Sequence, residues 1–271
     1  MLVISKVIKI QLSAIFLMAA LLLLSVGGLV GHAVVTESAV RYPALYVTPP
    51  AEFIRPAEKT VYFTFDDGPS RNTENILDML KAQDVKATFF VTAQKAEEDY
   101  FPALLQRMVD EGHTIGLHSY THEVDTVYQS VDSYLADVGK LNDYLFETVG
   151  VRADIYRFPG GSATAHCAPS TMKAIITEMS GRGYQFYDWH VVSGDDTPTV
   201  YSSDYLAQRM VKGCQGLDQV VVLLHDSPAP KTSADAVNLA INQLREQGYS
   251  FDRLTKEVEP VHIKTSRFQL P

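Results

Sequence analysis

Two adjacent carboxylates, Asp66 and Asp67, directly follow a hydrophobic run in the sequence Thr60-Val-Tyr-Phe-Thr-Phe-Asp-Asp-Gly-Pro69. Neighbouring carboxylates repel each other, and they are tolerated when one binds a cation and the other exchanges protons. Taken by itself, the pattern fits equally well a turn with two solvated aspartates, because Gly-Pro favours a turn. The other polar clusters of the chain decide between these interpretations.

A pair of histidines, His118 and His122, supplies nitrogen donors at a spacing of four residues. Side chains four apart lie on the same side of a helical turn, so both imidazoles could reach one ion. Together with Asp67 they form a set of two histidines and one carboxylate, which leaves positions open for water and substrate. This set predicts one catalytic divalent metal ion, zinc by default, with cobalt, nickel, iron and manganese as alternatives.

Three further candidate site residues, two polar and one aromatic, stand in or after hydrophobic runs later in the chain. Arg157 begins the segment Arg-Phe-Pro-Gly-Gly161, and its guanidinium could orient Asp66 by a bidentate contact. Trp189, the only tryptophan, is either a core aromatic residue or a flat wall for a sugar ring. His225 ends the run Gln219-Val-Val-Val-Leu-Leu-His225, and this position suits a general acid or base or a histidine that only caps a strand.

The hydrophobic patterns around these clusters alternate between strand and helix types from residue 58 to residue 258. Short runs of β-branched and aromatic residues predict buried strands at 61–65, 86–92, 114–117, 155–158, 184–188, 219–225 and 249–251. Apolar residues that recur at three and four predict amphipathic helices at 72–83, 100–111, 131–149, 171–179, 205–212 and 234–247.

This alternation indicates an α/β fold with a parallel sheet of about seven strands, close to the eight of a closed (β/α) barrel. The alternative is an open doubly wound sheet, although no Gly-x-Gly-x-x-Gly loop follows the first strand. In α/β folds the chemistry lies at the carboxyl ends of the strands, which is where the polar clusters are expected.

The composition of the chain limits which kinds of molecule it could bind. The chain has 271 residues, of which 46% are hydrophobic, enough for one substantial core, and its net charge is −9. An acidic balance argues against a nucleic-acid partner, because neutralising phosphates requires clustered lysine and arginine. It says nothing about a neutral sugar substrate.

The N-terminus has the pattern of a membrane-directed segment. Lys6 and Lys9 precede a nearly unbroken apolar run from about residue 10 to residue 35. This run is closer to the ~20 residues of a spanning helix than to the ~7–15 of a signal peptide. We therefore expect residues 1–35 to form an uncleaved signal-anchor with the rest of the chain outside the cytoplasm; cleavage near Ala33 and secretion is the alternative.

Residues 36–57, which carry four prolines, are expected to form a spacer before the domain at 58–258, and residues 259–271 a C-terminal tail. The chain has two cysteines, Cys167 and Cys214. In an oxidising compartment two cysteines can form one disulfide, and we expect that pairing. The alternative is two independent buried thiols.

The order of the motifs resembles the polysaccharide deacetylase family, the NodB-homology domain of carbohydrate esterase family 4. The matching segments are Thr64-Phe-Asp-Asp-Gly-Pro69, His118-Ser-Tyr-Thr-His122, Arg157-Phe-Pro-Gly-Gly161, Asp188-Trp189 and Leu223-Leu-His225. Each motif is ambiguous, but the ordered set is highly specific. The resemblance implies a distorted, incomplete (β/α) barrel that uses a divalent metal to remove N-acetyl groups from aminosugar polymers or acetyl esters from xylan.

The resemblance also implies a role for each matching polar residue. The metal ligands would be Asp67, His118 and His122. Asp66 would be the general base, held by Arg157, and His225 would be the general acid. The residues that bind the substrate or the developing oxyanion would be Tyr156 through its backbone N–H, Pro159, Gly160, Trp189 and Leu223.

The fourth motif departs from the family pattern. Members often have Trp-x-x-Asp, where the aspartate tunes the acidic histidine, but here Val192 stands at that position. Asp195 or Asp188 is left as the partner of His225.

Export and anchoring point to an extracytoplasmic wall polymer as substrate. The segments Arg-Phe-Pro-Gly-Gly-Ser and Asp-Trp-x-x-x-Ser-Gly-Asp resemble the peptidoglycan N-acetylglucosamine deacetylases of Gram-positive bacteria. Chitin oligomers, poly-N-acetylglucosamine and acetylxylan are alternatives.

Two alternative functions come from other classes of protein: an inactive carbohydrate-binding homologue and a hydrolase of small cyclic or aryl amides. The complete set of motifs disfavours the first, and the export signal disfavours the second.

Overall fold

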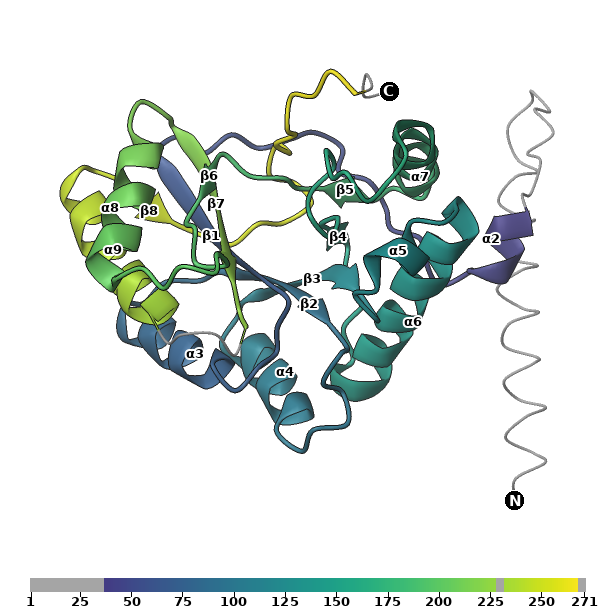
Figure 1. Cartoon of the computed structure of the whole chain (residues 1–271), viewed down its shortest axis with the longest axis horizontal. Coiled ribbons are helices and arrows are strands. Elements are labelled where there is room, and N and C mark those ends of the chain that lie inside the picture. The colour runs from purple at the N-terminus through teal and green to yellow at the C-terminus, as the bar shows by residue number, and fades with distance from the viewer. Residues whose placement is uncertain (1–36, 228–231, 268–271) are drawn as a thin grey trace. The chain divides into compact units, whose positions relative to one another are not determined.

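The computed structural model of the chain describes residues 37–227 and 232–267. From Arg41 onward the chain forms one unit, in which strands and helices alternate (Figure 1). The expected signal-anchor at 1–35 lies outside the described residues. Within the described ranges, none of the helices combines the length and the apolar character that a membrane crossing requires.

A parallel sheet forms the centre of this unit. Its strands within the described residues are β1 (Thr60–Asp66), β2 (Thr88–Thr92), β3 (Thr114–Ser119), β4 (Ile155–Tyr156), β5 (Gln185–Phe186), β6 (Val191–Val192), β7 (Gln219–His225) and β8 (Ser250–Phe251). Seven of them follow the order β5-β4-β3-β2-β1-β7-β6, β8 pairs with β1, and the pairings are parallel. The predicted α/β fold with a distorted, incomplete barrel is confirmed.

The barrel is incomplete because β5 and β6, which are consecutive along the chain, lie at opposite ends of the strand order. Residues 187–190 cross from one edge to the other, and an extended chain covers at most about 18 Å between Phe186 and Val191. A single strand at 184–188 was predicted, but only two residues pair there. The chain then leaves the sheet, and the N–H of Asp188 donates to the carbonyl of Val261 in the C-terminal segment.

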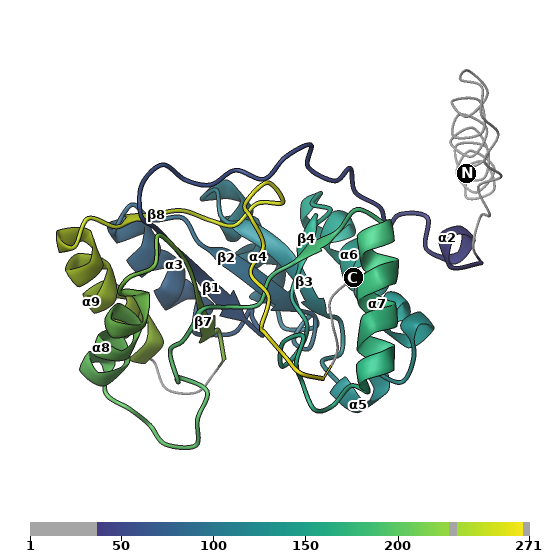
Figure 2. The ribbon, with the colours of Figure 1, turned by 90° about the horizontal axis from the view of Figure 1, so that it is seen from above.

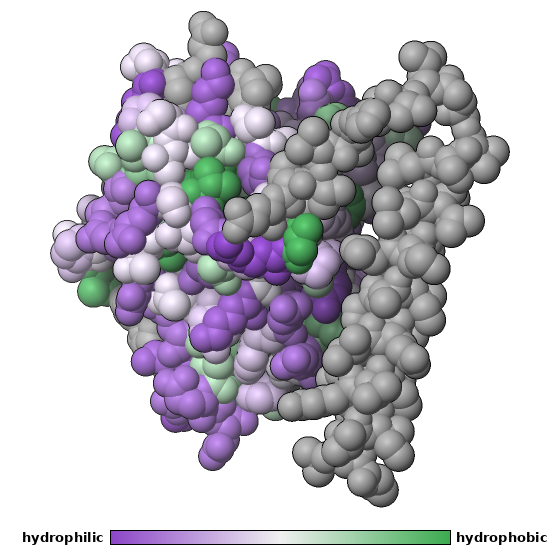
Figure 3. Space-filling view, turned by 90° about the vertical axis from the view of Figure 1, so that its right-hand side faces the viewer, coloured by the Kyte–Doolittle hydropathy of each residue, from purple (hydrophilic) through white to green (hydrophobic). Residues whose placement is uncertain are grey.

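The helices pack around the outside of the sheet (Figures 1 and 2). They are α3 (Thr73–Ala82), α4 (Phe101–Asp110), α5 (Val124–Val127), α6 (Val131–Val149), α7 (Pro169–Gly181), α8 (Ser203–Cys214) and α9 (Thr232–Glu246). A short helix, α2 (Glu37–Arg41), comes before them in the chain. The six helices predicted from periodicity are present with ends shifted by at most two residues, while the short α2 and α5 were not predicted. Apolar faces turn inward, and the coloured atoms of Figure 3 show a largely hydrophilic surface with small, separate hydrophobic patches.

Alternation along β1 divides the core into two layers. Phe63 and Phe65 belong to the large cluster beneath the helices, whereas Tyr62 belongs to a smaller cluster inside the barrel. Successive side chains of a strand point to opposite faces, so Thr64 and Asp66 share the inner face with Tyr62. The same alternation runs along β3 and β7. The inner face therefore changes from apolar at one end of the strands to polar at their carboxyl ends.

The two cysteines are not paired, which contradicts the predicted disulfide. Both are free and buried. Cys214 ends α8, whereas Cys167 lies two residues before the start of α7, and these two helices lie on opposite sides of the barrel (Figures 1 and 2). Burial raises the pKa of the Cys167 thiol to about 11 and that of the Cys214 thiol to about 12, as for two independent core thiols.

Gly116 on β3 leaves room for an aromatic ring inside the barrel. A Cβ at this position would lie 2.6 Å from two ring carbons of Phe90, which is fully buried. We expect Gly116→Ala to lower the free energy of unfolding by about 1–3 kcal/mol, because the packed ring must move. In Gly181→Ala, the added Cβ meets nothing within 4 Å, and stability should be unchanged or slightly raised. Denaturant unfolding of both variants tests this; equal stabilities would contradict it.

Candidate active site

The three predicted metal ligands converge on one point. Oδ1 of Asp67 lies 3.3 Å from Nε2 of His118 and 3.2 Å from Nε2 of His122, and the three donor atoms lie within 4.8 Å of one another. Oδ1 of Asp67 is buried and accepts no hydrogen bond from the described residues. A buried carboxylate oxygen without a donor, faced by two imidazole nitrogens, fits a bound cation of the kind that this donor set holds.

The surroundings of His118 direct its Nε2 toward that point. Its Nδ1 lies 2.9 Å from the carbonyl oxygen of Arg157, so Nδ1 carries a hydrogen and donates, and in the neutral imidazole the lone pair is on Nε2. Burial acts to lower the pKa of His118, but the charges of Asp66 and Asp67 outweigh burial and raise that pKa. Burial likewise acts to raise the pKa of Asp67, but His118 and His122 hold it well below its ordinary range. The site therefore favours positive charge beside Asp67.

The two histidines meet by a different route from the one predicted. They do not share a helical turn: His118 lies in β3, and His122 follows the strand with a φ of +57°. Asp67 also has a positive φ, +74°. In a regular strand Asp66 and Asp67 would point to opposite faces, but this turn brings both to one cavity. Such conformations cost about 1–3 kcal/mol at non-glycine residues, so the surrounding contacts must hold them.

Arg157 contacts Asp66, as predicted, but by one bond instead of two. Its Nη1 donates to Oδ1 of Asp66 at 2.8 Å and to Oγ1 of Thr64 at 2.6 Å. Nε and Nη2 are used by the carbonyls of Tyr187 and Asp188, at 2.7 Å and 3.0 Å, so they cannot form a bidentate contact. The guanidinium is fully buried, and it fixes the Asp66 carboxylate on the inner face.

Asp195 is the carboxylate that contacts His225. Its Oδ1 lies 3.0 Å from Nδ1 of His225, and its Oδ2 accepts the backbone N–H of His225 and the hydroxyl of Ser233. Burial acts to lower the pKa of His225, but Asp195, Asp66 and Asp67 raise it to about 9. The register of β1 and β7 places Asp66 opposite His225, so the expected base and acid are neighbours on adjacent strands.

Asp188, the other carboxylate considered as a partner of His225, has a separate set of contacts. It accepts the backbone N–H and the hydroxyl of Ser162 and the N–H of Ile263. Asp188 thus ties the Gly-Gly-Ser turn to the C-terminal segment.

A cavity of about 400 Å³ connects the groups described above. Its lining consists of Asp66, Asp67, His118, His122, Gly160, Trp189, Val192, Asp196, Leu223 and His225. Two residues expected at the substrate are not part of this lining. The carbonyl of Pro159 accepts the hydroxyl of Tyr128, and the side chain of Tyr156 is fully buried in the outer core against Phe158 and Phe186.

The sequence analysis did not predict two of the lining residues, Val192 and Asp196. Val192 stands where the family pattern has an aspartate, and only its apolar character was noted. Asp196 directly follows Asp195, and its Oδ2 lies 3.9 Å from Nε2 of His225 at the half-exposed rim of the cavity. The doubled aspartate was a visible signal, but nothing local indicates that one carboxylate turns inward and the other toward the cavity.

A third residue missed from the sequence, Asp226, supports the turn that carries Asp66. Asp226 packs against Gly68, where a Cβ would lie 2.2 Å from its Oδ2. It accepts the hydroxyls of Ser70 and Thr73, and its N–H donates to the carbonyl of Asp66 at 2.7 Å. Burial raises the pKa of Asp226 to about 7.

Comparisons with known proteins agree with this site. A family model for polysaccharide deacetylases matches residues 54–179. YheN of Bacillus subtilis, assigned as a polysaccharide deacetylase, is 35% identical over 211 residues, which is 76% of this chain and 70% of that protein. A peptidoglycan N-acetylglucosamine deacetylase of Bacillus cereus is 30% identical and covers 78% and 74% of the two chains. The peptidoglycan N-acetylmuramic acid deacetylase PdaA of Bacillus subtilis is 32% identical and covers 72% and 69%.

Solved structures of carbohydrate deacetylases and esterases are also similar to this chain. The catalytic domain of a peptidoglycan N-acetylglucosamine deacetylase from Eubacterium rectale superposes with a TM-score of 0.74 at 33% identity, covering 79% of this chain and 97% of that one. A family 4 acetyl xylan esterase from Clostridium thermocellum, in complex with a cobalt ion, superposes with a TM-score of 0.62 at 27% identity, covering 73% and 90%. The fold and site define a hydrolase of carbohydrate esterase family 4. The chain belongs to the polysaccharide deacetylase family.

The contact between His225 and Asp195 predicts a pH dependence of stability in the metal-free protein. The pKa of His225 rises from about 6.5 in the unfolded chain to about 9 in the folded protein. Its contribution to stability is therefore complete below about pH 6.5 and is lost as the pH rises through about 9.

Unfolding experiments on Asp195→Asn test this pH window. We expect the variant's loss of stability to be largest at pH 6 and smaller at pH 9.5, because the neutral histidine no longer gains from the carboxylate. His225→Gln serves as a control, since in its background the effect of Asp195→Asn should no longer depend on pH in this range. A stability difference that does not change with pH would contradict the assignment.

Proposed function

We propose that this protein removes N-acetyl groups from an aminosugar polymer, with peptidoglycan N-acetylglucosamine as the substrate, and releases acetate. One observation carries the proposal. Asp66, held by Arg157, and His225, held by Asp195, face the same cavity as the Asp67, His118 and His122 donors. Amide hydrolysis requires a base for the attacking water and an acid for the leaving nitrogen, and we assign these roles to Asp66 and His225 beside the metal donors.

Asp67, His118 and His122 would hold one divalent ion, with zinc favoured. A bound ion of this kind polarises a carbonyl and lowers the pKa of water. The relative with a cobalt ion supports a divalent metal in the family's fold, and cobalt, nickel, iron and manganese accept the same donors.

The remaining steps belong to the side chains around the cavity. Asp66 takes a proton from the water that adds to the acetyl carbonyl, and Arg157 keeps its carboxylate in place during the transfer. His225 gives its Nε2 proton to the sugar nitrogen as the C–N bond breaks, and Asp195 holds the ring by Nδ1. Trp189 provides a flat wall for a sugar ring. The products are acetate and a free amine on the sugar.

The Asp196 carboxylate at the rim of the cavity favours an uncharged sugar over muramic acid. Within the described part of the chain, no lysine or arginine side chain lines the cavity, whereas Asp66, Asp67 and Asp196 do. N-Acetylmuramic acid carries a carboxylate close to its acetamido group, and that carboxylate would be repelled by Asp196 at the rim, where no lysine or arginine lines the cavity within the described residues. N-Acetylglucosamine carries no such charge. Relatives named for both activities are similar to this chain, and this feature supports the first of the two as our proposal.

We further propose that the enzyme acts outside the cytoplasm and is held at the membrane by residues 1–35. The support is the apolar run after Lys6 and Lys9, together with the wall polymers named for its relatives. Deacetylated glucosamine would make the wall a poorer substrate for lysozyme-type hydrolases. Chitin oligomers, poly-N-acetylglucosamine and acetylxylan are the competing substrates, and the similarity to an acetyl xylan esterase makes the last worth testing.

Acetate release by a protein comprising residues 36–271 tests the chemistry. Activity on peptidoglycan should disappear with a chelator and return with zinc or cobalt. Asp66→Asn and His225→Ala should each lower kcat by about 10²–10⁴-fold and still bind metal, because general acid–base catalysis contributes that much. Asp67→Ala and His118→Ala should lose the metal. Near-normal turnover in Asp66→Asn, or activity that survives complete metal removal, would overturn the proposal.

Substrate preference tests the role of charge at the rim. The wild type should prefer N-acetylglucosamine oligomers to glycans in which N-acetylmuramic acid is the acetylated sugar. Two like charges about 6 Å apart repel by roughly 0.7–3 kcal/mol between aqueous and protein-surface dielectric values. Asp196→Asn should therefore raise kcat/KM for the muramic glycan relative to the glucosamine oligomer by about tenfold. Asp204→Asn, a carboxylate on α8 outside the cavity, is the matched control; equal ratios in all three proteins would count against this selection.

A further inference from the structure

The loop that carries His122 has no regular structure of its own. β3 ends at Ser119, and α5 begins only at Val124. His122 stands in this loop in a left-handed conformation, which a non-glycine residue adopts at a cost in energy. Some other part of the chain must hold the loop so that the His122 imidazole faces Asp67.

One side chain of α6 supplies that support. Oδ2 of Asp137 accepts the hydroxyl of Ser119 at 2.6 Å and the N–H of Tyr120 at 2.8 Å. Its Oδ1 accepts the N–H and the hydroxyl of Thr121 at 3.0 Å and 2.8 Å. The hydroxyl of Ser119 in turn accepts the N–H of His122 at 2.8 Å. Two hydrogen bonds in series thus connect Asp137 to the backbone of His122.

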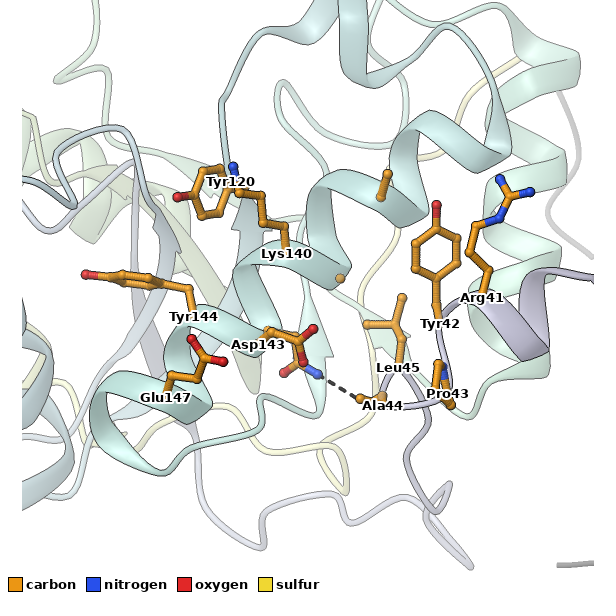
Figure 4. A pocket seen from close by; sticks show the side chains of 13 residues that line it. Arg41, Tyr42, Pro43, Ala44, Leu45, Tyr120, Lys140, Asp143, Tyr144 and Glu147 are labelled. Atoms are coloured by element: carbon orange, nitrogen blue, oxygen red, sulfur yellow. Dashed lines mark hydrogen bonds between the residues drawn. The ribbon is translucent and has the colours of Figure 1, made fainter. Parts of the chain in front are cut away.

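A second contact from α6 holds the other side of the same loop. Nζ of Lys140 lies 3.9 Å from the centre of the Tyr120 ring. Figure 4 shows Lys140 extending from α6 toward Tyr120 at the edge of an outer cavity of about 520 Å³. α6 is itself fixed at both ends, because the Ser130 side chain caps its first turn and Gly150 ends it with a φ of +71°. The helix is therefore a rigid support for the loop.

We propose that Asp137 is a positioning residue for the metal site, which sets the backbone of residues 119–122 so that His122 faces Asp67 and His118. The proposal rests on the ligand role given to His122 in the proposed function. A carboxylate is required because four donors converge on two oxygens. Asparagine offers one accepting oxygen, and its NH₂ group would face donors that it cannot satisfy.

Metal affinity separates a positioning role from a general structural one. Cobalt binding, followed by its visible absorption, should be about 10–100-fold weaker in Asp137→Asn than in the wild type, the range seen when partners behind a ligand are removed. Asp137→Glu keeps both accepting oxygens and should recover part of that loss. Asp143→Asn removes another carboxylate of α6, which pairs with Arg152, and is the matched control with unchanged affinity. Unchanged affinity in Asp137→Asn, or an equal loss in Asp143→Asn, would overturn the proposal.

A double-mutant comparison tests whether the effect passes through His122. In a His122→Ala background, Asp137→Asn should weaken cobalt binding no further, because the ligand that it positions is absent. A full additional loss in that background would contradict the proposal. In the metal-free protein, amide hydrogen exchange at residues 120 and 121 should be faster in Asp137→Asn, and unchanged exchange would also contradict it. If the wild type itself binds no cobalt, the ligand assignment in the proposed function fails, which is distinct from failure of the Asp137 role.

Discussion

The buried contact between Arg157 and Asp66 is the interaction on which the rest of the site depends. A guanidinium without solvent exposure is costly unless its donors are used and its charge is compensated. Here it bonds to the carboxylate and Thr64 on β1 and to two carbonyls in the crossing between β5 and β6. It also lies over the Phe90 ring, with its central carbon 4.2 Å from the ring centre. One side chain thereby joins the strand that carries Asp66, the proposed base, to the segment that carries Trp189.

The incomplete barrel explains why that segment is available. In a closed barrel β5 and β6 would pair along their length, but here residues 187–190 cross between the edges of the sheet. The carbonyls of Tyr187 and Asp188 are free to accept from Arg157, and the Trp189 side chain reaches the cavity. The gap in the sheet and the Trp189 wall of the cavity therefore come from the same departure from regular pairing.

Four aspartates in or next to the cavity have different hydrogen-bond partners and neighbouring charges, and these neighbours determine what each carboxylate can do. Asp66 is held by a buried cation, Asp67 faces two imidazoles, Asp195 is bonded to His225, and Asp226 lies against Gly68 and two hydroxyls. Residue type is the same in each case, so the division of roles comes from neighbours supplied by other strands. Asp137 on α6 extends this principle outside the cavity.

The sequence by itself determined the alternation of strands and helices, the polar residues at the strand ends and the family motifs. Those features depend on side-chain periodicity and on residues close together in the chain, so they can be read locally. Only the tertiary structure showed that Asp195, and not Asp188, contacts His225, that the cysteines are free, and that Asp137 supports the loop. Each of these features joins or separates segments that are distant in the sequence. The four-residue spacing of His118 and His122 suggested a helical turn, and only the backbone of the loop showed a strand end followed by a left-handed residue. Strand register and loop conformation determine such contacts, and neither can be recognised from the periodicity of the sequence.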